Sequence, residues 1–300
     1  MYYSIRHVTS FTYSSPIRES VQEVRMQPRS EGPQRCLTFK LLTEPRATVA
    51  SYVDSLGNRV HHFDIPDQHS ALTITAQAVV EMGAVSPLPE ALAAEAWTQL
   101  DALTADGAYW DYLQPSVYAR PTALLSELAT TLAIVRRSDP LTVLRELNTS
   151  LYTYFSYVPQ STTAKSPIDD ALRTRAGVCQ DFAHVMIALC RELQVPARYV
   201  SGYLAPREAR PDRSSADATH AWVEALLPGR GWVGFDPTND QLTAERHVRV
   251  AVGRDYADVP PNRGVFNYNK GSADQDLSVA VHVVPSETLP TQAAWSSPIL

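Results

Sequence analysis

The chain has 300 residues, of which 44% are hydrophobic and 19% are charged, and its formal net charge is -6. This composition supports a large folded core, excludes a mainly disordered chain, and provides no basic stripe of the kind that binds nucleic acid. The apolar runs are far shorter than the roughly 18 residues that cross a membrane, and three cysteines without a C-x2-C pair form neither a disulfide framework nor a zinc pattern.

Residues 1–83 predict a small all-β sandwich domain. Short segments rich in Val, Ile, Thr, Tyr and Phe end at Pro, Gly, Asn or Asp, from YYSIRHVTSFTYSS to ALTITAQAVVEM. Gly57 and Asn58 in SLGNRV indicate a hairpin turn. The first residues resemble no signal peptide, so together with the cysteine usage they favour a reducing, cytoplasmic setting.

Residues 84–300 predict a second domain of α+β class. Residues 84–160 are rich in Ala and Leu at helical spacing, residues 161–240 hold a further helix and then short strands, and residues 241–300 form a tail with one strand candidate, LSVAVHVVP. The polar segment 205–219 predicts a surface loop. Asp139-Pro140 marks the start of one helix, whose apolar face carries Leu141, Leu144, Leu147 and Leu151.

Two of the three cysteines lie in one predicted helix, at residues 177–195. Cys179 and Cys190 are eleven residues apart, which on a helix is about 16 Å and excludes both a mutual disulfide and a shared metal ion. Cys190 lies in apolar sequence and is expected to be a small buried residue. Cys179 follows Gly177 at the start of the helix, where the helix dipole favours a thiolate, so it is the candidate nucleophile.

A thiol nucleophile needs an imidazole base and a third group that orients the imidazole. His220 opens the strand HAWVEALL, and Asp236 ends the strand GWVGFD. If Leu226 pairs with Trp232 across a five-residue loop, His220 and Asp236 share a face of the sheet, whereas a four-residue loop would separate them. Asp236 can also be read as a turn residue before a proline. Surface or core roles are expected for His7, His61, His62, His69, His247 and His282.

Three segments together resemble the bacterial transglutaminase-like superfamily, whose members are often described as cysteine proteases: GVCQDFAHVMIALCRELQVPARYVSGYL, HAWVEALLPGRGWVGFDPTND and VAVGRDYADVPPNRGVF. The N-terminal YSIRHVTSFTYSSPI and DSLGNRV resemble the β domain that precedes the catalytic domain in these proteins. The resemblance implies a papain-like or transglutaminase-like core, in which a helix with the cysteine packs on an antiparallel sheet with the histidine and aspartate. It also implies a triad of Cys179, His220 and Asp236.

The expected reaction is cysteine-dependent amide hydrolysis or acyl transfer on a peptide or protein, through a thioester. Protease-like hydrolysis is placed first, glutamine transamidation or deamidation second, and a catalytically silent binding scaffold third. The backbone N–H of Cys179 is the natural first oxyanion donor. Gln180 and Tyr157 are candidates for the second donor, and Trp222 for shielding the imidazole. We expect no metal, no cofactor, and neither nucleic acid nor membrane as a partner. The segment 253–261, GRDYADVPP, is expected to fasten the tail to the core or to line the cleft.

Overall fold

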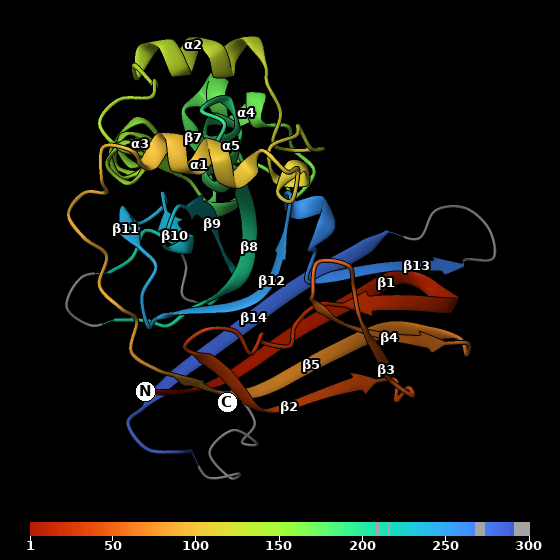
Figure 1. Cartoon of the computed structure of the whole chain (residues 1–300). Coiled ribbons are helices and arrows are strands. Elements are labelled where there is room, and N and C mark those ends of the chain that lie inside the picture. Colours follow the sequence, from red (N-terminus) through yellow and green to blue (C-terminus); the bar gives the residue numbers. More distant parts are fainter. Residues whose placement is uncertain (208–210, 215–216, 268–273, 291–300) are drawn as a thin grey trace.

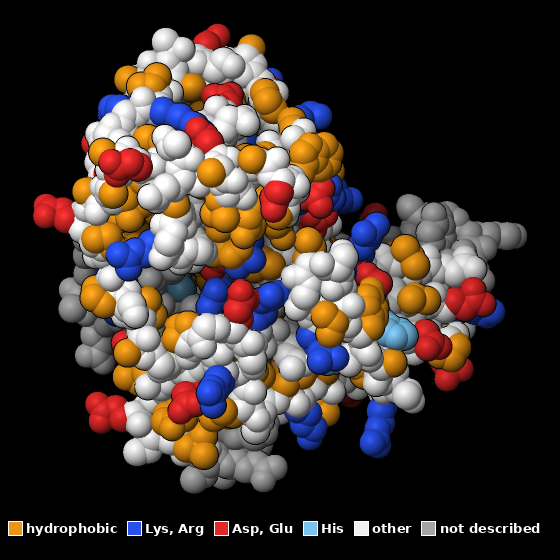
Figure 2. Space-filling view, in the orientation of Figure 1, with side chains coloured by type: hydrophobic (Ala, Val, Ile, Leu, Met, Phe, Trp, Pro, Cys, Tyr) orange, Lys and Arg blue, Asp and Glu red, His pale blue; other side chains and the backbone are white. Residues whose placement is uncertain are grey.

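The computed structural model describes residues 1–207, 211–214, 217–267 and 274–290. It has two lobes, one built of β-strands and one of helices with a second sheet (Figure 1). Charged side chains of both signs are dispersed over the face drawn in the space-filling view, with apolar patches between them (Figure 2). The predicted α+β class is confirmed by this arrangement. Among the described residues, no helix is both long and apolar enough to span a membrane.

The β lobe is one curled sheet of seven strands, organised around a long first strand, β1. The first part of β1 pairs with β5 and β14, and its last part pairs with β4 and β13, so one strand serves both halves of the sheet. A closed apolar interior results, which includes Phe11, Ile17, Phe63 and Leu72. The strands are β1 (Tyr2–Val24), β2 (Gln34–Glu44), β3 (Ala50–Val53), β4 (Arg59–Ile65), β5 (His69–Met82), β13 (Asn262–Asn267) and β14 (Gln275–Ser286).

The structure differs from the predicted division of the chain at the tail. Residues 241–300 were assigned to the second domain, but β13 and β14 extend the N-terminal sheet alongside β1 (Figure 1). The strand candidate LSVAVHVVP does form a strand, β14. Its alternating pattern predicts a strand with one buried and one exposed face, but it does not predict which strand it pairs with. Within this tail and in the predicted loop, residues 208–210, 215–216, 268–273 and 291–300 lie outside the described part of the chain.

Helices begin where the sequence supplies start signals. The predicted helix after Asp139 is confirmed, because the Asp139 carboxylate accepts hydrogen bonds from the backbone N–H groups of Leu141 and Thr142, and Pro140 occupies the first turn. The helices are α1 (Ala96–Thr104), η1 (Trp110–Tyr112), α2 (Ala123–Thr131), α3 (Pro140–Tyr154), α4 (Ile168–Thr174), α5 (Cys179–Glu192) and η2 (Tyr256–Asp258).

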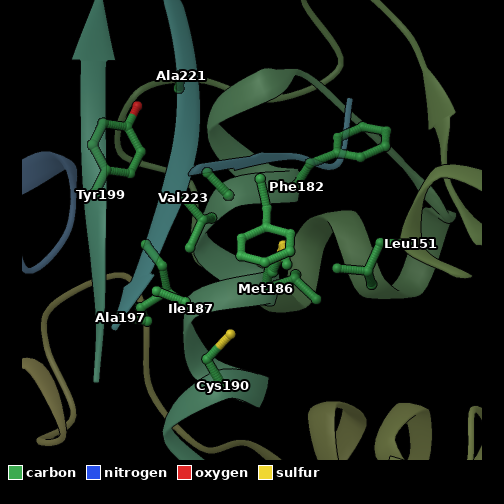
Figure 3. Packing of buried hydrophobic residues seen from close by; sticks show 14 of the residues in the cluster. Leu151, Phe182, Met186, Ile187, Cys190, Ala197, Tyr199, Ala221 and Val223 are labelled. Carbon is green, nitrogen blue, oxygen red and sulfur yellow. The ribbon is translucent and has the colours of Figure 1, made fainter. Parts of the chain in front are cut away.

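The second sheet packs its central strands against α5. Its order is β11 (Gln241–Leu242), β10 (Gly231–Asp236), β9 (His220–Leu227), β8 (Ala197–Leu204) and β12 (His247–Gly253), and a short parallel pair, β6 (Ser156–Tyr157) and β7 (Ala176–Gly177), leads into the helix. The thiol of Cys190 is fully buried, and burial raises its pKa to about 12, so the predicted packing role is confirmed. Side chains that meet between the helix and the two central strands are Phe182, Met186, Ile187, Cys190, Ala197, Tyr199, Ala221 and Val223 (Figure 3).

Two amide side chains join the lobes by completing the open edge of β12. Asn58 donates to the carbonyl of Val252 at 2.9 Å and accepts from its N–H at 2.8 Å. Gln34 does the same for Arg249, with both distances 2.8 Å. Each amide therefore replaces a neighbouring strand, and the two buried side chains hold the β lobe against the edge of the second sheet.

Candidate active site

Cys179 is the first residue of α5, and the local backbone exposes its N–H. Val178 is extended, and its N–H donates to the Asp181 carboxylate at 2.8 Å, which fixes the turn into the helix. A Cβ on Gly177 would lie 2.8 Å from Cβ of Asp181, so only glycine fits there. The N–H groups of a first helical turn have no partner within the helix. A half-buried thiol and an available N–H donor therefore come from the same residue.

His220 and Asp236 lie together because the strands pair in the predicted register. Trp232 of β10 pairs with Leu226 of β9, as the five-residue loop required. Nε2 of His220 then lies 2.8 Å from Oδ2 of Asp236, and both side chains are buried. Nδ1 of His220 is also buried and makes no hydrogen bond of good geometry among the described residues, although the Cys179 side chain is near enough to raise the pKa of His220. One ring nitrogen is thus held by the carboxylate, and the other is left for proton exchange.

His220 and Asp236 each stabilise the charged form of the other. Burial lowers the pKa of His220, but the charge and hydrogen bond of Asp236, together with the nearby Cys179 sulfur, outweigh burial and raise it to about 10. Burial would raise the pKa of Asp236, but His220 and His247 hold it well below its usual range. The imidazole is therefore held protonated near neutral pH, and the carboxylate is held ionised. The Cys179 side chain is one of the groups that raise the pKa of His220.

Asp236 accepts more hydrogen bonds than a turn residue would need. Besides His220, its Oδ2 receives the side-chain amide of Asn239 at 2.9 Å, that of Gln241 at 3.3 Å and Nε2 of His247 at 3.2 Å. Its Oδ1 accepts the N–H of Thr238 at 3.1 Å. So many donors allow a carboxylate to remain ionised when fully buried.

His247 was not recognised from the sequence, where a core or surface role was expected. It is the first residue of β12, and its Nδ1 accepts the N–H of Ala244 at 3.3 Å. The proton must then be on Nε2, which donates to Asp236. Burial lowers the pKa of His247, and this keeps the ring neutral. No local sequence pattern predicts the contact of His247 with Asp236, because β12 pairs with β8 and its first residue approaches Asp236 only when the sheet is folded.

The other predicted residues lie close to the site in different ways. Gln180 uses its amide nitrogen to donate to the carbonyl of Ala164 at 3.2 Å, which leaves the second hydrogen of that amide. Tyr157 pairs with Gly177, beside the turn into α5. Trp222 is buried, with its ring 6.0 Å from that of His220 and 5.2 Å from that of His247. The oxyanion roles of Gln180 and Tyr157 and the shielding role of Trp222 all stay predictions, although the Trp222 ring does contact both imidazoles.

The segment GRDYADVPP fastens several elements together and also contributes to a cleft. The guanidinium of Arg191 on α5 donates to the carbonyl of Arg254 at 2.7 Å, and Asp255 accepts the N–H of Tyr118 at 2.6 Å. Tyr256 donates its N–H to His184 of α5 at 3.2 Å and lines an open groove. The expected fastening role is therefore confirmed by these hydrogen bonds, whereas the role in lining the active-site cleft stays a prediction.

Three buried side chains have the composition of a metal site. The ligand atoms of His220, Asp236 and His247 all lie within 4.8 Å of one another. However, both Nε2 atoms are at hydrogen-bond distance from one carboxylate oxygen. A cation would have to displace these N–H donors from Asp236, so the donor set fits a hydrogen-bonded carboxylate better than a metal centre.

Comparisons with known proteins agree with this architecture. Residues 3–81 match the family model described as bacterial transglutaminase-like N-terminal region, and residues 129–237 match that of the transglutaminase-like superfamily. The chain belongs to the transglutaminase-like superfamily. The transglutaminase-like core match ends one residue after Asp236 and so includes all three predicted triad positions.

Relatives of similar length share the whole transglutaminase-like chain. An uncharacterized protein of Mycobacterium tuberculosis strain H37Rv is 36% identical over 311 residues, covering 95% of this chain and 93% of its own. One from Mycobacterium leprae is 33% identical over 276 residues, covering 92% and 96%. A Pseudomonas aeruginosa protein named protein-glutamine gamma-glutamyltransferase is 38% identical over 104 residues, which are 31% of this chain and 15% of that protein.

A solved structure has the same fold over nearly the whole transglutaminase-like chain. It is that of a "Putative Cysteine Protease" from Cytophaga hutchinsonii, with a TM-score of 0.72 and 23% sequence identity, covering 97% of this chain and 93% of that one. The predicted combination of a transglutaminase-like core with a preceding β domain is confirmed.

Proposed function

We propose that the chain is a cysteine-dependent enzyme that transfers the acyl group of a peptide or protein amide, with Cys179 as nucleophile. His220 would carry the proton, and Asp236 would orient His220. The observation that supports this best is the buried His220–Asp236 pair. The carboxylate of Asp236 holds Nε2 of His220 and leaves Nδ1 of the same ring available, and the Cys179 side chain helps to raise the pKa of His220. A packing role for these residues would not require a protonated imidazole beside a thiol.

The reaction begins with the proton on His220 and the negative charge on the sulfur of Cys179. The sulfur attacks the amide carbon, and the C=O electron pair moves onto oxygen, where the N–H of Cys179 donates a hydrogen bond. When the C–N bond breaks, the leaving amine takes the proton from His220. A thioester and a neutral imidazole remain, so atoms and charges balance.

The second half of the reaction decides which product forms. Neutral His220 removes a proton from the incoming nucleophile, which attacks the thioester carbon and expels the sulfur. Water as nucleophile gives hydrolysis, and we place this first because water needs no docking surface. A primary amine gives transamidation, which the local similarity to a protein-glutamine gamma-glutamyltransferase supports as the second candidate.

The test is mass spectrometry of a peptide library incubated with the protein, with and without a primary amine. Cleaved peptides would identify a protease, amine adducts on glutamine a transglutaminase, and glutamate in place of glutamine a deamidase. Each product should vanish with Cys179→Ala. Products that persist in that variant, or a wild-type protein that modifies nothing and whose Cys179 reacts no faster than its other thiols, would contradict the proposal and favour a silent scaffold.

A further inference from the structure

A groove of about 680 Å³ lies where the two lobes meet. Its floor is one face of the β lobe, because alternate residues of β1 and β14 point into it. The floor is made of cross-strand pairs, which are Thr9 with Val279, Phe11 with Leu277 and Tyr13 with Gln275. Two of these residues are unusually exposed for large apolar side chains, Leu277 at 52% and Val279 at 43%. The β14 side of the floor is therefore apolar and exposed, whereas Phe11 and Tyr13 on the β1 side are buried in the core of the β lobe.

The opposite wall of the groove carries immediate neighbours of the candidate active site, although Cys179, His220 and Asp236 do not line the groove themselves. Thr219 lines the groove and immediately precedes His220. Ala164 also lines it, and its carbonyl accepts the hydrogen bond of Gln180, the residue after Cys179. Tyr256 is bonded to His184, farther along the same helix. A chain lying in the groove would thus run toward the N-terminus of α5.

The charge of the groove differs from that of the whole molecule. The protein has a net charge of -6, yet no carboxylate is among the described residues that line the groove, while Lys165 and Arg263 do line it. His7 also lines it but does not add charge at neutral pH, because burial lowers its pKa to about 4. The lining thus combines apolar and uncharged polar side chains with two cations and no carboxylate, and it complements a peptide that carries both apolar and acidic side chains.

We propose that this groove binds the substrate polypeptide next to its reacting amide, and that it selects a short stretch combining aromatic or aliphatic residues with acidic ones. The inference rests on the proposed acyl-transfer function. From Thr9 to Tyr13 the floor spans about 13 Å at strand spacing, which accommodates roughly four extended residues. The β lobe is then the part of the enzyme that recognises the substrate, and the catalytic lobe supplies the chemistry.

Binding can be measured without turnover in the Cys179→Ala protein, using fluorescence anisotropy of two labelled peptides, FEFEQG and FKFKQG. The acidic peptide should bind at least about fivefold more tightly, since it meets two cations and no carboxylate. Val279→Glu and Lys165→Glu should each weaken its binding by roughly fivefold, because each places a negative charge in the groove.

Matched controls come from the same chain. Val284→Glu changes an exposed valine on the opposite face of β14, and Lys40→Glu reverses an exposed lysine on β2, so neither should alter binding. Equal thermal melting of Val279→Glu and Val284→Glu would exclude misfolding as the cause of weak binding.

Equal affinity for the two peptides, or unchanged binding by Val279→Glu, would overturn the inference. Alkylation of Cys179 by iodoacetamide in the wild-type protein tests the proposed reaction separately. Slow alkylation together with selective peptide binding would reject the chemistry and retain the groove. Fast alkylation without selective binding would do the opposite.

Discussion

Nε2 of His247 lies 3.2 Å from Oδ2 of Asp236, the oxygen that also holds His220 at 2.8 Å. Since the Nδ1 atom of His247 accepts a backbone N–H, the Nε2 atom donates, so a neutral His247 and a protonated His220 share one carboxylate oxygen. The neutral ring of His247 helps to keep Asp236 ionised without competing for the role of proton carrier. Residues later in the chain thus donate hydrogen bonds that keep Asp236 ionised and in position to hold His220.

Replacing His247 should therefore weaken the fold around Asp236. We expect His247→Leu to lower the free energy of unfolding by about 1.5–3 kcal/mol, the typical value of a hydrogen bond to a charged group. His247→Gln retains an N–H donor and should recover part of this loss. Urea denaturation of both variants measures the difference, and equal stability of His247→Leu and wild type would show that the bond contributes nothing.

Cys179 should be the most reactive thiol of the protein. Burial raises the pKa of Cys36 to about 11 and that of Cys190 to about 12, so both stay protonated at neutral pH. Cys179 has a protonated imidazole beside it, and we expect iodoacetamide to alkylate it at least about tenfold faster.

The control for this labelling is His220→Gln, whose amide nitrogen takes the place of Nε2 and can still donate a hydrogen bond to Asp236 but cannot carry the positive charge. It should slow the alkylation of Cys179 and leave the other two thiols unchanged. Peptide mapping after timed labelling gives the three rates separately. Similar rates for all three cysteines in the wild-type protein would refute a special role for Cys179.

The sequence predicts those site residues whose positions are set by a single helix or a single hairpin. The start of α5 follows from Gly177 and the apolar spacing behind it, and the contact of His220 with Asp236 follows from the register of one hairpin. His247 could not be predicted, because its strand joins the far side of the sheet next to β8. For the same reason, the pairing of β14 with β1 is not visible in the alternation of either strand.

Acid should destabilise the protein through its buried neutral histidines, and His7 tests this. Its pKa is lowered by burial from 6.5 to about 4, and it bonds Tyr203 at 3.0 Å and Thr9 at 3.2 Å. Between these pH values the unfolded chain binds a proton that the folded chain does not. The stability present above pH 6.5 is therefore lost as the pH falls toward 4, at up to about 1.4 kcal/mol per pH unit for each such group.

His7→Gln removes the titrating imidazole, and its amide takes the place of Nε2, so that it can still form a hydrogen bond with Thr9. The slope of the unfolding free energy against pH, measured by urea denaturation between pH 6.5 and 4, should become less steep by about 1.4 kcal/mol per pH unit. His282→Gln, on the exposed side of β14, provides the comparison and should leave the slope unchanged. Identical slopes for all three proteins would mean that His7 is protonated in the folded state.

We expect Asn58 to stabilise the junction between the two lobes more than it stabilises the turn in which it lies. Gly57 has the positive φ of 77° that the turn requires, whereas the Asn58 side chain completes the edge of β12 at Val252. Asn58→Ala leaves the buried N–H and C=O of Val252 without their partner, which we expect to cost about 2–4 kcal/mol of unfolding free energy. The amide of Val252 should also exchange its hydrogen faster. Asn267→Ala, which removes an exposed amide at the end of β13, is the matched control. If both variants unfold at the same urea concentration as the wild type, the two lobes are held together by other contacts, such as the paired amide of Gln34.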